Sequence, residues 1–221
     1  AVGLCHGVFG TARRLAQIID VPYEKIRYLC AGINHLAFFL KFEADGKDAY
    51  PLIRKAFDTT HADQELVRQE MFRRLGYFMT ESSYHLSEYL PYFIKSDELI
   101  EEYDIAVDEY VLRSEEAVEI FEKVHQAFVE GRNLLAEGGQ VTFVPRSRMR
   151  RGHAEPGEEV AAFRIPDRPS GEYASRICNA IATGDTFVFN GNVLNTGLIT
   201  NLPDNTCVEV PCLVDGNGIQ P

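Results

Sequence analysis

Residues 76–89 read GYFMTESSYHLSEY, and the rest of the sequence is organised around this stretch. It combines hydroxyls, carboxylates and an imidazole with aromatic side chains. A helix that began at Thr80 would place Glu81, His85 and Glu88 at positions i, i+4 and i+7, on one face. Because ionisable side chains do not form a core face, the pattern predicts one of two things. It is either a solvated helix edge or the wall of a site that uses acids, bases or metal ligands.

The chain on either side of this stretch alternates between strand-like and helix-like patterns. Apolar and aromatic residues cluster in short runs in the expected strands, and they recur every three or four positions in the expected helices. Turn signals such as Asp45-Gly46 and Asn190-Gly191-Asn192 separate these elements. The expected strands are 1–5, 25–31, 36–43, 186–189, 197–199 and 207–214, and the expected helices are 11–19, 50–57, 63–75 and 172–182. This order predicts an α+β fold with a mixed or antiparallel sheet and packed helices.

A long amphipathic helix is predicted in the middle of the chain, ending near Glu137. Its apolar stripe is typical of core packing, so we assign it no chemistry. The stripe consists of Val107, Val111, Val118, Phe121, Phe128 and Leu135. The acidic segment 95–104 before it is expected to be a connector. Residues 138–170 after it, rich in Pro, Gly and Arg, are expected to be a loop insertion that contains the basic run 146–151.

Composition excludes several classes of protein. The 221 residues are 45% hydrophobic and 25% charged, as in ordinary globular proteins, and carry a formal net charge of −11. This charge argues against a nucleic-acid partner, because phosphate binding depends on Lys and Arg. No window approaches the roughly 20 apolar residues of a membrane helix, and the first residues do not resemble a signal peptide. We therefore expect no membrane partner and a cytoplasmic location.

The five cysteines are Cys5, Cys30, Cys178, Cys207 and Cys212. An odd number without a CxxC pair predicts reduced thiols, which fits the cytoplasm. The chain begins in an apolar run without an initiator Met and stops in a turn sequence after a strand. We interpret it as an internal piece of a longer protein.

Cys5 and His35 are the first pair of candidate metal ligands. Cys5 ends an apolar run just before a glycine turn and a helix, and His35 lies between two expected strands. Both side chains are therefore expected at one edge of the sheet. A dinucleotide-binding loop is rejected here, because the glycines at 3, 7 and 10 do not form GxGxxG and no strand ending in an acidic residue follows at the usual distance.

Several motifs, in this order, resemble the NAD-dependent family 4 glycoside hydrolases, in particular their α-galactosidase (melibiase) branch. They are GLCHG at 3–7 with GT at 10–11, GINH at 32–35, TESSYH at 80–85 with SEY at 87–89, NGNVLN at 190–195, NLP at 201–203, and VEVPC at 208–212 with GI at 218–219. Each motif alone is weak, but together they make the resemblance specific. It covers most of the chain outside 138–170.

The resemblance implies a lactate/malate-dehydrogenase-like enzyme of two domains. Residues 1–221 correspond to its carboxyl-terminal catalytic and metal-binding part, and the NAD-binding Rossmann domain lies outside this sequence. Ordinary glycosidases use two carboxylates, and this family is an exception. The implied route oxidises C3 of the sugar with NAD, removes the C2 proton, eliminates the aglycone, adds water and returns the hydride. The fragment alone is expected to be inactive.

By position, Cys5 and His35 match the family's metal ligands. The family's metal is Mn2+, whereas the softness of a Cys/His pair favours zinc or iron. We follow the family, with Fe2+, Co2+ or Ni2+ as possible substitutes. The resemblance implies that Glu81 or, second, Tyr84 is the base that removes the C2 proton.

Four further residues, His6, Asn34, His85 and Glu88, are candidates either to contact sugar hydroxyls or to orient the metal ligands. The expected substrate is a small α-linked sugar, and the resemblance implies a homo-oligomer, a dimer or tetramer. Two alternatives stay open. One is an α-galacturonidase or α-glucosidase of the same family, and the other is a non-catalytic sugar-binding or oligomerisation module.

Overall fold

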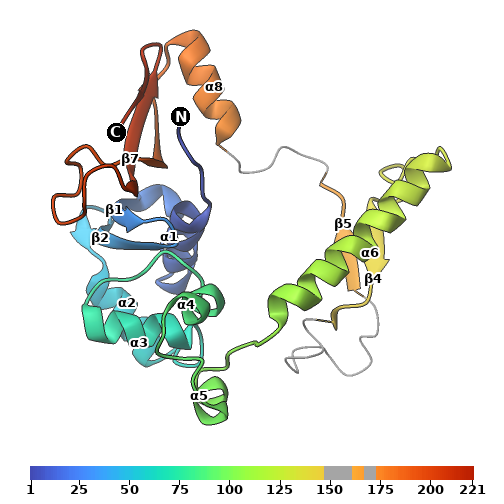
Figure 1. The fold of residues 1–221 in the computed structure, drawn as a ribbon, viewed down its shortest axis with the longest axis horizontal. Helices are drawn as coiled ribbons and strands as arrows, with labels where there is room; N and C mark the ends of the chain where they lie inside the picture. The colour runs from blue at the N-terminus through green and yellow to red at the C-terminus, as the bar shows by residue number, and fades with distance from the viewer. Residues whose placement is uncertain (147–160, 167–172) are drawn as a thin grey trace. The chain divides into compact units, whose positions relative to one another are not determined.

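The computed structural model describes residues 1–146, 161–166 and 173–221. The chain divides into two compact units, Ala1–Ile105 with Tyr173–Pro221, and Ala106–Glu172. The helices in the described residues are α1 (Gly7–Ile18), η1 (a 3-10 turn, Tyr23–Lys25), α2 (Tyr50–Asp58), α3 (Leu66–Leu75), α4 (Ser83–Tyr89), α5 (Asp97–Glu102), α6 (Glu109–Val129) and α8 (Ala174–Thr183). The strands are β1 (Ile26–Ile33), β2 (Leu36–Ala44), β3 (Lys47–Asp48), β4 (Gln140–Phe143), β5 (Ala161–Arg164), β6 (Phe187–Leu194), β7 (Cys207–Asp215) and β8 (Gly218–Gln220) (Figure 1).

The first unit contains a six-stranded sheet in the order β3-β2-β1-β7-β6, with β8 paired to β7. Each of these pairings is antiparallel. The sheet joins an early hairpin to strands from the end of the chain through the β1–β7 contact. Helices pack on both sides of it, and the predicted α+β fold is therefore confirmed.

The two faces of this sheet carry separate cores. Neighbouring residues in a strand point to opposite faces, so Cys30 belongs to the core shared with α1 and α2, and Ala31 packs against the core shared with α8. Figure 1 shows α1 against β1 and β2, and α8 beside β7. A third cluster lies among α3, α4 and the segments that follow.

The β1–β2 turn depends on Gly32. Its φ is +153°, and a Cβ atom added there would lie 2.6 Å from the backbone Cα of Ala37. No side chain fits this close approach of two strands. The hairpin then turns at Asn34 and His35, with His35 at a φ of +67°. This turn places His35 at the end of the sheet.

Several element boundaries differ from those predicted. α4 begins at Ser83 rather than Thr80, because the Ser82 Oγ accepts a hydrogen bond from the His85 N–H and caps the helix. Glu81 therefore lies outside the helix, and the i, i+4, i+7 arrangement is wrong for it. The connector at 95–104 contains α5, which Ser96 caps in the same way.

The end of the sheet also differs. The predicted turn at 190–192 lies inside β6, whereas residues 197–199 form no strand. Gly191 is accommodated in β6 because its missing side chain leaves room for Val2, Phe189 and Cys212, all within 3.1 Å of an added Cβ. At the beginning of the chain, only Gly3 pairs with the sheet, and α1 starts earlier than predicted.

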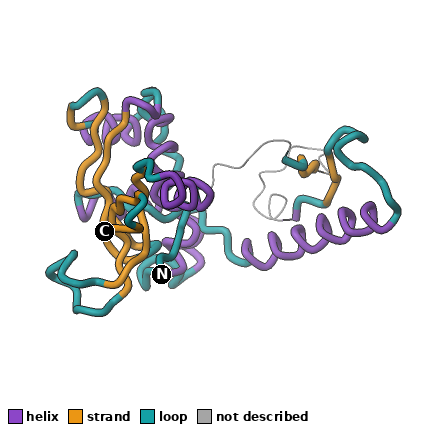
Figure 2. The backbone as a smooth tube through the Cα atoms, turned by 90° about the horizontal axis from the view of Figure 1, so that it is seen from above, coloured by secondary structure: helices purple, strands orange, loops and turns teal. Residues whose placement is uncertain are grey.

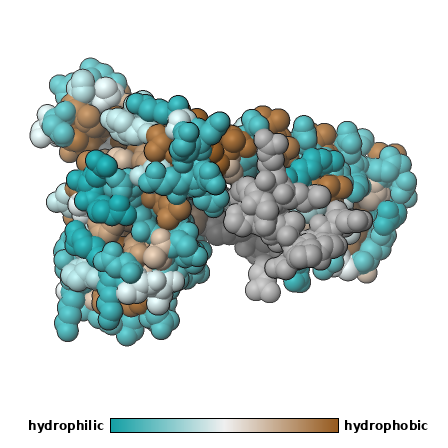
Figure 3. Space-filling model, turned by 90° about the horizontal axis from the view of Figure 1, so that it is seen from below, coloured by the Kyte–Doolittle hydropathy of each residue, from teal (hydrophilic) through white to brown (hydrophobic). Residues whose placement is uncertain are grey.

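The second unit consists of α6 and the antiparallel β4–β5 pair in the described residues. The long helix is confirmed (Figure 2), but it ends at Val129 rather than near Glu137, so Leu135 lies outside it. The prediction that its stripe is core is wrong for this chain. Phe121 and Phe128 are 67% and 80% exposed. Periodicity shows that one side of a helix is apolar but not what covers it. Figure 3 shows hydrophobic side chains (brown) at several places on the visible surface.

The predicted insertion at 138–170 lies partly outside the described residues, as does most of the basic run at 146–151. Its described ends are strands β4 and β5 rather than loop. Among the described residues, no helix combines the length and apolar character needed to span a membrane.

Candidate functional site

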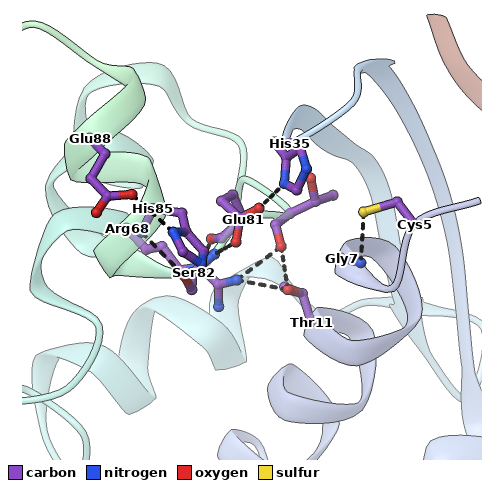
Figure 4. Close-up of polar contacts among 10 residues, drawn as sticks. Cys5, Gly7, Thr11, His35, Arg68, Glu81, Ser82, His85 and Glu88 are labelled. Carbon is purple, nitrogen blue, oxygen red and sulfur yellow. Dashed lines mark hydrogen bonds and ion pairs between the residues drawn. The ribbon is translucent and has the colours of Figure 1, made fainter. Parts of the chain in front are cut away.

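Three segments that are distant in sequence meet at one end of the first unit's sheet. They are the start of α1, the β1–β2 turn and the segment Thr80–Glu81 before α4 (Figure 4). A Cβ added to Gly7 would lie 3.6 Å from the Thr80 carbonyl oxygen and 3.7 Å from the Cys5 Sγ. Gly7 is therefore the contact point between the Cys5 end of α1 and the Glu81 segment.

His35 and Glu81 form a direct pair between the imidazole Nδ1 and the carboxylate Oε2. Burial would raise the pKa of Glu81, but His35, the Ser82 N–H and the nearby His85 hold that pKa below its ordinary value. Glu81 is therefore an acceptor, and the Nδ1 of His35 carries the proton. In a neutral imidazole, a proton on Nδ1 leaves the other ring nitrogen, Nε2, with a lone pair, as in carboxylate–histidine–metal arrangements.

Arg68 holds the backbone that carries Glu81. Its guanidinium is buried, donates to the carbonyl oxygens of Thr80 and Glu81, and also reaches the Thr11 hydroxyl at 2.8 Å. Thr11 in α1 donates to the same Thr80 carbonyl. One buried cation thus ties α1, α3 and the Glu81 segment together, and the sequence patterns indicated no such role.

Cys5 is half-buried immediately before α1, and its Sγ accepts a hydrogen bond from the Gly7 N–H at 3.5 Å. Burial raises the pKa of the Cys5 thiol, the Gly7 N–H lowers it, and the carboxyl groups of Glu209 and Glu81 raise it further. A divalent cation would reverse this balance, because a coordinated thiol is deprotonated.

Glu209 is the main ionisable residue of the site that sequence reasoning missed. It lies in β7, is 1% exposed and interacts electrostatically with Cys5, His35 and Glu81. Burial raises its pKa to about 7; His35 opposes this rise and Glu81 adds to it. One signal was available: a lone carboxylate between valines in an apolar strand must either be paired or serve a site.

We expect the stability of the metal-free protein to depend on pH through Glu209. Its pKa is higher in the folded state than in the unfolded state, so the folded state binds the proton more tightly. The free energy of unfolding, measured relative to Glu209→Gln, should therefore fall by at most about 3 kcal/mol as the pH rises from about 5 to 7. Above pH 7 it should level off.

The measurement is urea unfolding of both proteins in EDTA at several pH values. Changes in groups that do not interact with Glu209 are shared by the two proteins and cancel in the difference. A difference in unfolding free energy that stays constant from pH 5 to pH 8 would contradict this prediction.

The other predicted site residues are placed as follows. His85 and Glu88 pair at 3.0 Å in α4, and the Tyr89 ring contacts the rings of both His35 and His85. Tyr84 lies half-buried in the first turn of α4. The Asn34 Oδ1 is buried and has no hydrogen-bond partner within the part of the chain that the structure describes. His6 is exposed and packs edge-on against Phe9.

The structure thus groups Cys5, His35 and Glu81, with the His85–Glu88 pair beside them. The donor types suit a metal ion, because the site holds a thiol, an imidazole and unpartnered oxygen acceptors at Asn34 and Glu209. Within the described ranges, however, no three His, Cys, Asp or Glu side chains are arranged to hold a metal. Among the described residues, Cys5 and His35 would be its protein ligands, and the rest of the coordination shell would be open to water or substrate.

The Family 4 glycosyl hydrolase C-terminal domain matches residues 30–221. The chain belongs to family 4 of the glycosyl hydrolases. This match covers the β1–β2 turn, Arg68, Glu81, α4 and Glu209, so most of the residues that form the site lie inside the family 4 domain.

Curated relatives and solved structures agree with this family. The chain is 38% identical to an α-galactosidase of Bacillus subtilis over 100% of its own length and 45% of that protein. It is 32% identical to an α-galactosidase of Rhizobium meliloti, over 99% of the chain and 41% of that protein. It thus spans about half the length of these curated family 4 relatives.

The crystal structure of lplD from Bacillus subtilis superposes with a TM-score of 0.74 at 22% identity, over 100% of this chain and 49% of that one. A 6-phospho-β-glucosidase from Thermotoga maritima was solved with manganese, NAD+ and glucose-6-phosphate. It superposes with a TM-score of 0.56 at 18% identity, over 99% of this chain and 44% of that one. At these identities the structures support the family 4 fold.

Proposed function

We propose that the full-length protein hydrolyses α-galactosides and needs both NAD and a divalent metal. The observation that carries the proposal is the Cys5, His35 and Glu81 group, in which one imidazole nitrogen is held by a carboxylate and the other is left for a metal. The 38% identity to an α-galactosidase supports the substrate class. α-Galacturonidase is the second candidate, since one from Bacillus subtilis is 26% identical.

The cofactors are proposed from the family and from its solved members, which contain NAD and Mn2+. When bound, they supply a hydride acceptor for C3 of the sugar and a positive charge that polarises the C3 oxygen. Cys5 and His35 would hold the metal, with Mn2+ as the first choice.

The chain's own residues would do the remaining work. Glu81 orients His35 through the Nδ1 contact, and Glu81 or Tyr84 is the proposed base that removes the C2 proton. Asn34, His85 and Glu88 are proposed to position sugar hydroxyls. His6 stays a proposal of the same kind, although its ring packs against Phe9.

Deuterium incorporation tests the proposed chemistry. During hydrolysis of an aryl α-galactoside in D2O, the C2 proton is removed and replaced from solvent, so the released galactose should carry deuterium at C2. Proton NMR of the product measures this directly. Galactose that keeps its original proton at C2 would contradict the elimination route.

Two controls sharpen this experiment. Omitting NAD should abolish both hydrolysis and exchange, because the C2 proton is acidic only next to an oxidised C3. An aryl α-galacturonide assayed in parallel decides between the two candidate substrates, and the preferred one should have the higher kcat/KM.

A further inference from the structure

One row of the sheet places two polar side chains between two glycines. Across the strands, Gly3 pairs with Asn192, Asn192 with Glu209, and Glu209 with Gly32. Residues directly opposite each other in neighbouring strands project from the same face. Asn192 and Glu209 therefore stand side by side, with no side chain on either flank.

This row faces the candidate site. Cys5 lies two residues after Gly3 in the chain, and Asn34 lies two residues after Gly32. Glu209 lies on the side of the sheet opposite Val208 and Val210, which pack against the α8 core. The electrostatic interactions of Glu209 with Cys5, His35 and Glu81 agree with this placement. Asn192 and Glu209 thus lie on the sheet face below Cys5 and His35, and we call these two residues the floor of the site.

The floor carries acceptors that have no hydrogen-bond partner among the described residues. The Glu209 Oε1 and the Asn192 Oδ1 are buried without a hydrogen-bond partner, as is the Asn34 Oδ1. Glu209 is 1% exposed and Asn192 is 9% exposed. A buried polar atom left unpaired costs about 1–3 kcal/mol, and native proteins keep such atoms mainly where a ligand completes them.

The missing partner must be a cation or a hydrogen-bond donor. The Cys5 thiol and the Glu209 carboxyl are acidic groups beside His35, and the two cations near Glu81, Arg68 and His85, are already paired with other groups. Since the described residues hold no third direct ligand, Glu209 is suited to contact the shell around the ion rather than the ion itself.

We propose that Glu209 is a positioning residue for the divalent metal at Cys5 and His35, accepting hydrogen bonds from the water or hydroxyl groups that complete its coordination. This inference rests on the proposed function and names a residue beyond its two ligands. Asn192 supports the same O–H groups through its Oδ1. Partners in such outer positions change metal affinity by about 10- to 100-fold.

Mn2+ binding to the full-length protein tests this role, with free Mn2+ followed by EPR. Glu209→Gln keeps the shape of the side chain but removes its charge, and it should raise the Kd for Mn2+ at least about 10-fold. Glu43→Gln is the matched control, because this β2 carboxylate lies in the same sheet and pairs with Lys41. It should leave the Kd within about twofold.

Two further measurements separate positioning from simple loss of structure. With Co2+ as the probe, the thiolate-to-metal absorption band of Cys5 should shift in Glu209→Gln at saturating metal, although thermal unfolding shows an intact fold. The titration with and without galactose distinguishes water from sugar hydroxyls as the partner. If Glu209→Gln does not fold, Glu209→Asp, which withdraws the carboxyl by one methylene, is measured instead.

The outcomes separate this inference from the proposed function. A wild-type Kd in Glu209→Gln, together with loss of Mn2+ binding in Cys5→Ser, overturns the role of Glu209 and leaves the metal site standing. Mn2+ binding that survives in Cys5→Ser, or is absent from the wild-type protein, overturns both.

Discussion

Replacing Cys5 with Ser in the full-length protein should lower kcat/KM on an aryl α-galactoside by about 1000-fold or more. A serine hydroxyl stays protonated where a thiol on a metal becomes an anion. The variant therefore loses one of two protein ligands and the metal's charge at the sugar oxygen. Such charge stabilisation is worth several kcal/mol, and about 4 kcal/mol corresponds to 1000-fold in rate.

The assay uses saturating NAD and Mn2+ under reducing conditions, with bound metal counted per chain. Cys178→Ser is the matched control, since this thiol is exposed on α8 and should leave kcat/KM within about twofold. If Cys5→Ser keeps both its metal and its activity, the assignment of Cys5 as a ligand is wrong.

Replacing Arg68 with Met should lower the free energy of unfolding by about 4 kcal/mol, because removing one partner of a buried charged network is strongly destabilising. Methionine fills the apolar part of the space but leaves the carbonyl oxygens of Thr80 and Glu81 without their donor. It also leaves the Glu65 carboxylate, 3.6 Å from the guanidinium, without its cation.

Thermal unfolding of the metal-free protein measures this loss, expected as a fall in Tm of roughly 10 °C for a chain of this size. Arg74→Met serves as the control. Its side chain is 73% exposed and pairs with Glu70 at 2.5 Å, so it should cost below about 1 kcal/mol. Equal Tm values for the two variants would show that the Arg68 network does not hold the site together.

Local patterns predicted much of the fold correctly. β1 and β2 lie within two residues of their predicted ends, as do α2 and α8. These elements carry a strong apolar pattern bounded by turn residues, and both signals act over a few neighbouring residues. Where a cap decides the boundary, as Ser82 does for α4, the spacing of ionisable residues did not show where the helix starts, and the assumed start at Thr80 was too early.

The apolar stripe of α6 shows the limit of such patterns. Its spacing predicted the helix, but Phe121 and Phe128 are exposed in the structure. A helix forms from contacts within a few turns, whereas burial of its apolar side depends on which other segments reach it. The sequence of the helix does not contain that information.

The candidate site divides in the same way. The sequence by itself determined the residue types at Cys5, His35 and Glu81, together with the family motifs that contain them. Only the tertiary structure placed Glu81 on the Nδ1 of His35, Arg68 beneath the Glu81 backbone, and Glu209 in one row with Asn192. The reason is physical: strand register and the pairing of the first hairpin with the last strands join residues far apart in the chain, and no local spacing encodes those contacts.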